Sequence, residues 1–106
     1  MAVRYQLVLQ FPFSGMEDYD YVIAYESLLM SRLPRRLARV DGHDVGSGQM
    51  NIFIFTDRPE KALEECRSLI RSSRISDGLN AAYRTVTGDD YVRLWPQGST
   101  EPFAVA

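Results

Sequence analysis

The run Met50-Asn51-Ile52-Phe53-Ile54-Phe55 constrains the fold of this chain most, because it is apolar at five of its six positions. A strand with one face in water alternates apolar and polar residues, whereas a strand covered on both faces is apolar on both. We therefore expect residues 50–55 to form an interior strand of a sheet.

Two helices and a first strand are predicted around this run. Residues 3–11 alternate as in a half-buried strand. Ser14 and Glu17 have the spacing of a reciprocal cap at a helix start, and the apolar stripe that follows ends at Pro34. The sequence Asp57-Arg58-Pro59-Glu60 predicts a second helix start, since proline is tolerated in the first turn.

Two hairpins complete the predicted fold. Three glycines in residues 42–48 indicate a long loop before the interior strand, and residues 81–87 and 91–95 form a second strand pair. The order β-α-β-β-α-β-β is that of a ferredoxin-like split βαβ fold with one extra strand. We expect an α+β domain over residues 1–96, with one mainly antiparallel sheet and two helices on one face, followed by a C-terminal tail, residues 97–106.

Composition excludes several classes of protein. The 106 residues suffice for one domain, and 12 basic against 14 acidic residues give a net charge of -2, unlike a dedicated nucleic-acid binder. Cys66 is the only cysteine, so an intramolecular disulfide and a multi-cysteine zinc site are impossible. No apolar segment is long enough to cross a membrane, and no signal-peptide core is visible. We expect a cytoplasmic protein with no cofactor and no membrane partner.

The first candidate site is a sheet face. If Met50, Ile52 and Ile54 face the helices, then Asn51, Phe53, Phe55 and Val8 share the opposite face. An exposed aromatic patch commonly marks a partner surface, so a protein partner or a second copy of the chain is expected to bind there. Two alternatives stay open: the tail or the extra strand covers these rings, or the parity is reversed.

Paired rings on a central strand also resemble the base-stacking strand of RNA-recognition modules. The glycine that precedes the first ring in those modules is absent here, and Arg4, Gln6, Val8 and Gln10 supply no aromatic partner. We expect no nucleic-acid binding.

The second candidate site is the polar stretch Asp41-Gly42-His43-Asp44, which holds the sole histidine. His43 can act as a general base on Ser47 or on water, or Asp41, His43 and Asp44 can bind a divalent metal. In an extended strand Asp41 and His43 share one side and Asp44 points to the other, so convergence requires a bend. The simpler interpretation is a hairpin turn with an exposed histidine, without catalytic residues or a metal.

Arginines cluster at two places, after the first helix and along the second. Arg67, Arg71 and Arg74 share roughly one face of the second helix, and the first helix exit holds four arginines within eight residues, Arg32, Arg35, Arg36 and Arg39. Either group can hold an anion, but solvated salt bridges explain such clusters more simply.

Two functional interpretations follow. The favoured one is a small non-catalytic binding protein, of inhibitor or immunity type, that recognises a protein partner or itself through the sheet face and residues 41–48. The alternative is a small enzyme or ligand-sensing subunit with a pocket between paired sheets and His43 at its rim.

Overall fold

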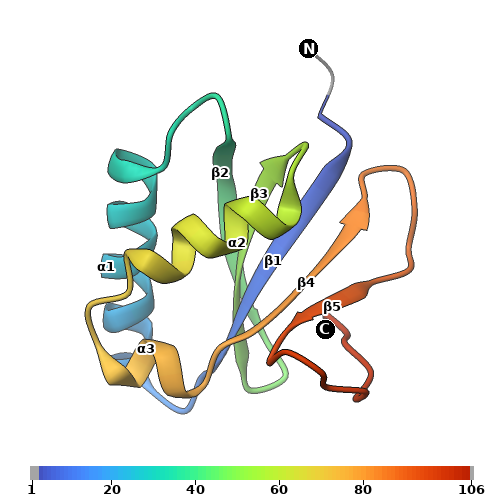
Figure 1. The fold of residues 1–106 in the computed structure, drawn as a ribbon. Helices are drawn as coiled ribbons and strands as arrows, with labels where there is room; N and C mark the ends of the chain where they lie inside the picture. Colours follow the sequence, from blue (N-terminus) through green and yellow to red (C-terminus); the bar gives the residue numbers. More distant parts are fainter. Residues whose placement is uncertain (1–2, 106) are drawn as a thin grey trace.

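A computed structural model describes residues 3–105 of the chain, which form one five-stranded antiparallel sheet and three helices (Figure 1). In chain order these are β1 (Tyr5–Pro12), α1 (Met16–Arg32), β2 (Ala38–Gly46), β3 (Gln49–Thr56), α2 (Pro59–Ser68), α3 (Ser73–Asp77), β4 (Asn80–Thr85) and β5 (Val92–Trp95). The sheet order is β2-β3-β1-β4-β5. The predicted α+β class is confirmed. The short helix α3 was not predicted.

The core lies between the three helices and one face of the sheet. Strands β1 and β3 contribute inward-facing apolar side chains, and all three helices pack against them. The strand residues are Leu7, Leu9, Phe11, Met50, Ile52 and Ile54. The helix residues are Val22, Tyr25 and Leu29 of α1, Ala62, Leu63 and Cys66 of α2, and Ile75 of α3. The register pairs Leu9 with Ile52, so the two most apolar strands are neighbours, as the sequence predicts. Residues 3–105 include no helix with the length and hydropathy of a membrane span.

The single thiol belongs to this core. Cys66 is fully buried, and burial raises the pKa of its thiol to about 12. The Tyr25 hydroxyl donates a hydrogen bond of 2.6 Å to the Cys66 backbone carbonyl, which joins α1 to α2. A thiol that stays protonated at neutral pH is a poor nucleophile, so Cys66 acts as a small apolar side chain.

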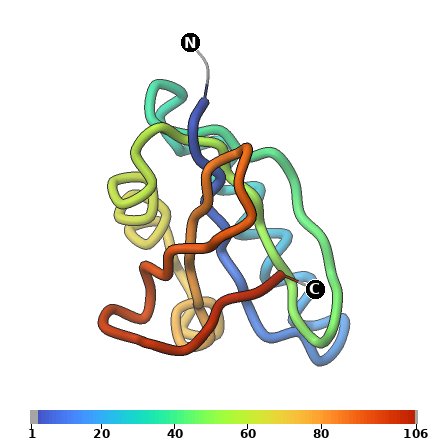
Figure 2. Tube along the Cα trace, turned by 90° about the vertical axis from the view of Figure 1, so that its right-hand side faces the viewer, coloured from blue at the N-terminus to red at the C-terminus, as the bar shows by residue number. Residues whose placement is uncertain are grey.

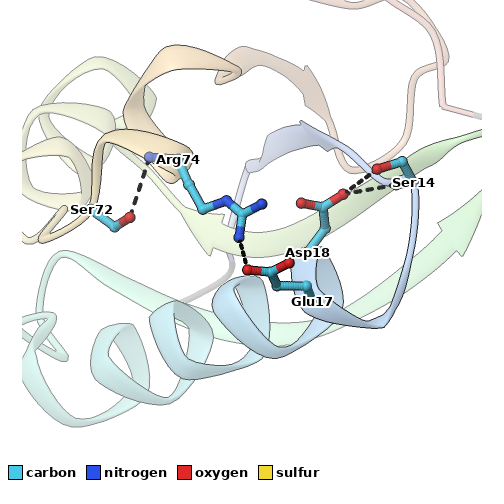
Figure 3. A network of polar contacts seen from close by, with 5 residues as sticks. All are labelled: Ser14, Glu17, Asp18, Ser72 and Arg74. Carbon is cyan, nitrogen blue, oxygen red and sulfur yellow. Dashed lines mark hydrogen bonds and ion pairs between the residues drawn. The ribbon is translucent and has the colours of Figure 1, made fainter.

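The start of α1 differs from the predicted reciprocal cap. The backbone N–H and the hydroxyl of Ser14 both donate to the Asp18 carboxylate, at 2.9 and 2.7 Å. Glu17 instead pairs with Arg74 at the start of α3, and the Ser72 hydroxyl accepts the Arg74 N–H (Figure 3). The acidic residues of the first turn therefore serve two purposes: one fixes the preceding loop, and the other ties α1 to α3.

Removing the Ser14 hydroxyl is expected to raise the pKa of the Asp18 carboxyl. The side-chain and backbone hydrogen bonds from Ser14 lower that pKa below its ordinary value of 3.8, and Ser14→Ala removes the larger contribution. Because the folded-state pKa is lowered, the contact stabilises the fold above about pH 4 and is lost as pH falls through the folded value. NMR titration of the Asp18 carboxyl measures the shift. Ser27→Ala, elsewhere on α1, is the control, and identical Asp18 titrations in both variants would contradict the assignment.

Candidate functional site

The predicted long loop over residues 42–48 is wrong. Strand β2 continues to Gly46, and only Ser47 and Gly48 form the turn to β3. Both turn residues have positive φ, 51° and 74°, which matches the twist of a two-residue hairpin and suits glycine at the second position. Residues 41–46 therefore belong to an edge strand of the sheet.

A register shift between Val40 and Gly42 sets the direction of the polar side chains in β2. It places His43 opposite Ile52 and Asp44 opposite Asn51, so His43 lies on the helix side and Asp44 on the outer side of the sheet. Asp41 lies at the irregularity and is exposed. The candidate residues Asp41, His43 and Asp44 consequently do not converge, and residues 3–105 contain no cluster of three side chains suited to a metal ion.

His43 finds a partner on α1 instead. Its Nδ1 lies 2.9 Å from Oε1 and 3.1 Å from Oε2 of Glu26, a carboxylate that is almost completely buried. The edge of the Tyr19 ring packs near the imidazole, with the ring centres 6.2 Å apart. An ionised carboxylate only accepts hydrogen bonds, so in a pair with ionised Glu26 the Nδ1 of His43 is the donor. The His43 side chain is 31% exposed.

The sequence did not predict the Glu26–His43 pair, although the position of Glu26 indicated that this residue needs a partner. It interrupts the apolar stripe of α1, and a buried acid at such a position needs a partner. The only histidine is 17 residues away, and nothing in the spacing predicts that β2 lies against α1 there. The contact depends on tertiary structure.

A chain of polar side chains crosses the outer face of the sheet. Asn51 is fully buried; its Nδ2 donates to Asp44 at 2.9 Å, and its Oδ1 accepts from Gln10 Nε2 at 3.1 Å. Gln10 Nε2 also donates to the carbonyl of Ala104, at 2.9 Å. One candidate binding residue, Asn51, is thus an internal link between three strands and the C-terminal segment.

The C-terminal segment folds back over this outer face. In Figure 2 its red trace crosses the blue trace of β1, in agreement with the bond from Gln10 to Ala104. The Arg93 guanidinium donates to the carbonyls of Glu101 and Pro102, and the Phe103 ring packs on Tyr91 with centres 5.1 Å apart. Part of the predicted tail, through Val105, is therefore a cover for one end of the sheet. Ala106 lies outside the described residues.

The other end of the outer face stays more open. The rings of Phe53 and Phe55 are partly exposed, whereas Val8 is fully buried beside Phe53. On the β2 side Phe53 faces Gly42, and no atom lies within 4 Å of the position that a Cβ of Gly42 would take. The Arg39 guanidinium lies 5.5 Å from the centre of the Phe55 ring. We call the partly exposed surface formed by Arg39, Gly42, Asp44, Phe53 and Phe55 the outer aromatic patch.

Comparison with known proteins adds no further assignment to this geometry. No family model, no curated protein and no solved structure matches the chain. Function must therefore be argued from the two arrangements above, the Glu26–His43 pair on the helix side and the outer aromatic patch on the other.

Proposed function

We propose that this chain is a small binding protein without catalytic activity, and that its recognition surface is the outer aromatic patch. The observation that carries the proposal is the partial exposure of two neighbouring rings, Phe53 and Phe55, on a strand whose other residues, apart from Gln49, are buried. Apolar rings left in water at the surface of a domain commonly mark an interface. The notch at Gly42 gives an incoming side chain room beside the Phe53 ring.

The partner that best fits this patch is a second copy of the chain. The patch carries a cation at Arg39 and an anion at Asp44, at opposite ends of the same strand face. In a twofold interface every contact between two residues occurs twice, once in each direction. Arg39 of one copy is thereby placed near Asp44 of the other copy, and Asp44 of the first near Arg39 of the second. Opposite charges placed this way favour one register of two stacked sheets.

The proposal includes a fold family and a location. The order β2-β3-β1-β4 supports a ferredoxin-like fold, because each helical crossover connects strands separated by one antiparallel neighbour. The helix α3 and the edge strand β5 are additions to that plan. A reducing compartment such as the cytoplasm suits the free thiol of Cys66, and recognition through the patch needs no cofactor, nucleic acid or membrane.

Light scattering over a range of protein concentrations tests the self-association. We expect a mass of twice 12.1 kDa for the wild type, and a monomer for Phe53→Ser combined with Phe55→Ser, because the rings supply the apolar part of the interface. Met16→Gln is the matched control, since Met16 is an exposed apolar residue at the start of α1, away from the patch.

Circular dichroism of each variant separates loss of the interface from loss of the fold. If the double variant unfolds, Gly42→Leu keeps both rings and fills the notch beside Phe53, and it is expected to give a folded monomer. A wild-type protein that remains monomeric at every concentration would contradict self-association.

The Glu26–His43 pair favours the second candidate, a small enzyme. A buried carboxylate that holds Nδ1 orients an imidazole so that Nε2 can accept a proton, as in many general bases. Tyr19 is the aromatic side chain that packs against His43, but Ser47, the predicted target of the base, lies at the turn beyond the end of β2. The pair thus supplies an oriented base, and the binding interpretation remains the better supported of the two.

A further inference from the structure

A cleft on the helix side of the molecule combines arginine, serine and apolar side chains. It has a volume of about 380 Å³ and is lined by residues from the end of α2, from α3 and the segments on either side of it, and from the edge strand β5. Its lining consists of Arg67, Ile70, Arg71, Ser72, Ser73, Ser76, Leu79 and Trp95. Neither candidate site described above includes these residues.

The charge of this cleft is opposite to that of the chain. Arg67 and Arg71 both line it, and no lining residue is an aspartate or a glutamate, although the chain carries a net charge of -2. The neighbouring cleft of about 410 Å³ also contains Arg67, but there Glu60 and Glu64 contribute to the lining. Of these two neighbouring clefts, the first is the one that presents cations without a carboxylate in its wall.

The two cleft arginines differ from Arg74 in their partners. Arg74 is paired with Glu17, whereas the ion pairs found within residues 3–105 include neither Arg67 nor Arg71. Arg67 lies in the last turn of α2 and Arg71 lies beyond its end, and both line the cleft. An anion bound between two cations interacts favourably with each of them. The arrangement is thus more favourable with an anion than without one.

The rest of the wall holds one arginine in place and offers further contacts. The Arg67 guanidinium stacks over the Trp95 ring, 3.5 Å from its centre, which limits its motion while its N–H groups remain available to a ligand. The Ser73 side chain adds a hydroxyl to the lining, and Ile70 and the largely buried Leu79 contribute apolar atoms to the wall.

We propose that this cleft binds a small phosphate ester, with the phosphate between Arg67 and Arg71 and the organic group against Ile70 and Leu79. A guanidinium pairs with carboxylate and phosphate oxygens alike, but a phosphate monoester has three free oxygens and a charge of about -2 near pH 7, so it can pair with two arginines at once. The volume of the cleft suits a small molecule. This site is independent of self-association, so either proposal can fail without the other.

The fluorescence of Trp95, the only tryptophan in the chain, reports on the site because Arg67 lies on its ring. We expect a saturable change on titration with butyl phosphate, weaker binding of inorganic phosphate, and no change with butanol. Arg71→Gln is expected to weaken the binding of butyl phosphate by about tenfold or more, the loss of one charge-assisted contact. Added salt should weaken it as well.

Arg36→Gln serves as the matched control, because Arg36 is exposed in the connection between α1 and β2 and does not line the cleft. It should bind butyl phosphate as the wild type does. Equal weakening in Arg36→Gln and Arg71→Gln would overturn the site, as would the absence of saturation with either phosphate. Equal affinity for butyl phosphate and inorganic phosphate would overturn the proposed contact of the organic group.

Discussion

Replacing Asn51 with aspartate is expected to destabilise the fold by about 3–5 kcal/mol at neutral pH, which is typical for a buried charge without a partner. The Asn51 side chain is fully buried, and its Nδ2 donates to the Asp44 carboxylate. The substitution exchanges that donor for a second carboxylate oxygen at the same place. Two negative groups at hydrogen-bond distance repel, and the new carboxylate at the buried position 51 loses most of its hydration.

The pH dependence of this variant has a definite sign. Proximity to Asp44 and burial both favour the protonated form of the new carboxyl, so its pKa in the folded state lies above its unfolded value. The destabilisation is therefore fully present above the folded pKa and declines as pH falls toward the unfolded value of about 4. Urea unfolding at several pH values measures the difference from wild type.

Asn80→Asp is the matched control on the same sheet face. The Oδ1 of Asn80 accepts a hydrogen bond of 2.7 Å from Arg93, so a carboxylate there meets a cation. We expect this variant to be close to the wild type in stability. Similar losses in the two variants, or a loss in Asn51→Asp that does not shrink at low pH, would contradict the role given to the buried amide.

Substituting alanine for His43 is expected to cost about 1–3 kcal/mol, the usual penalty for a buried polar group that loses its partner. Glu26 is almost fully buried, and His43 is the side chain that meets both of its oxygens. The space vacated by the imidazole is partly open, which lets water reach the carboxylate and holds the penalty below that of a sealed site.

A double-mutant cycle isolates this interaction. Glu26→Leu is the second substitution, because it removes the charge and fills the buried position with an apolar side chain. If the pair is the reason for the loss, His43→Ala should cost less in the Glu26→Leu background than in the wild type. Equal costs in the two backgrounds would show that His43 stabilises the protein independently of Glu26.

Periodicity predicted the elements of this fold well where the signal is local. Met50, Ile52 and Ile54 lie in the core, and residues 3–11 and 50–55 are adjacent strands. The glycines at 42, 46 and 48 were misleading. They indicated a loop, but only Gly48 adopts a turn conformation with positive φ, while Gly42 accommodates a strand irregularity. Glycines show where a chain is able to turn, but they do not determine at which of those positions it turns.

The candidate sites were harder to predict, because each depends on contacts between segments distant in sequence. Val8 and Asn51 were placed on the outer face, and nothing local showed that Asn51 joins Gln10 to Asp44 beneath the C-terminal segment. The favoured interpretation of residues 41–48 was a turn, and the alternative, a converging cluster of Asp41, His43 and Asp44, required a bend. The strand instead sends His43 and Asp44 to opposite faces. The register between strands determines both the contacts of Asn51 and the faces on which His43 and Asp44 lie, and no local sequence pattern specified that register.

The bond from Gln10 to Ala104 also has a kinetic consequence. It joins residues 94 positions apart, so we expect this contact to form late in folding, after the strands that it covers have paired. Until then the whole outer face, with the apolar strand of residues 50–55, is accessible to other chains. We therefore expect aggregation during refolding to depend on how fast this C-terminal cover docks, and slower docking to lower the yield at high protein concentration.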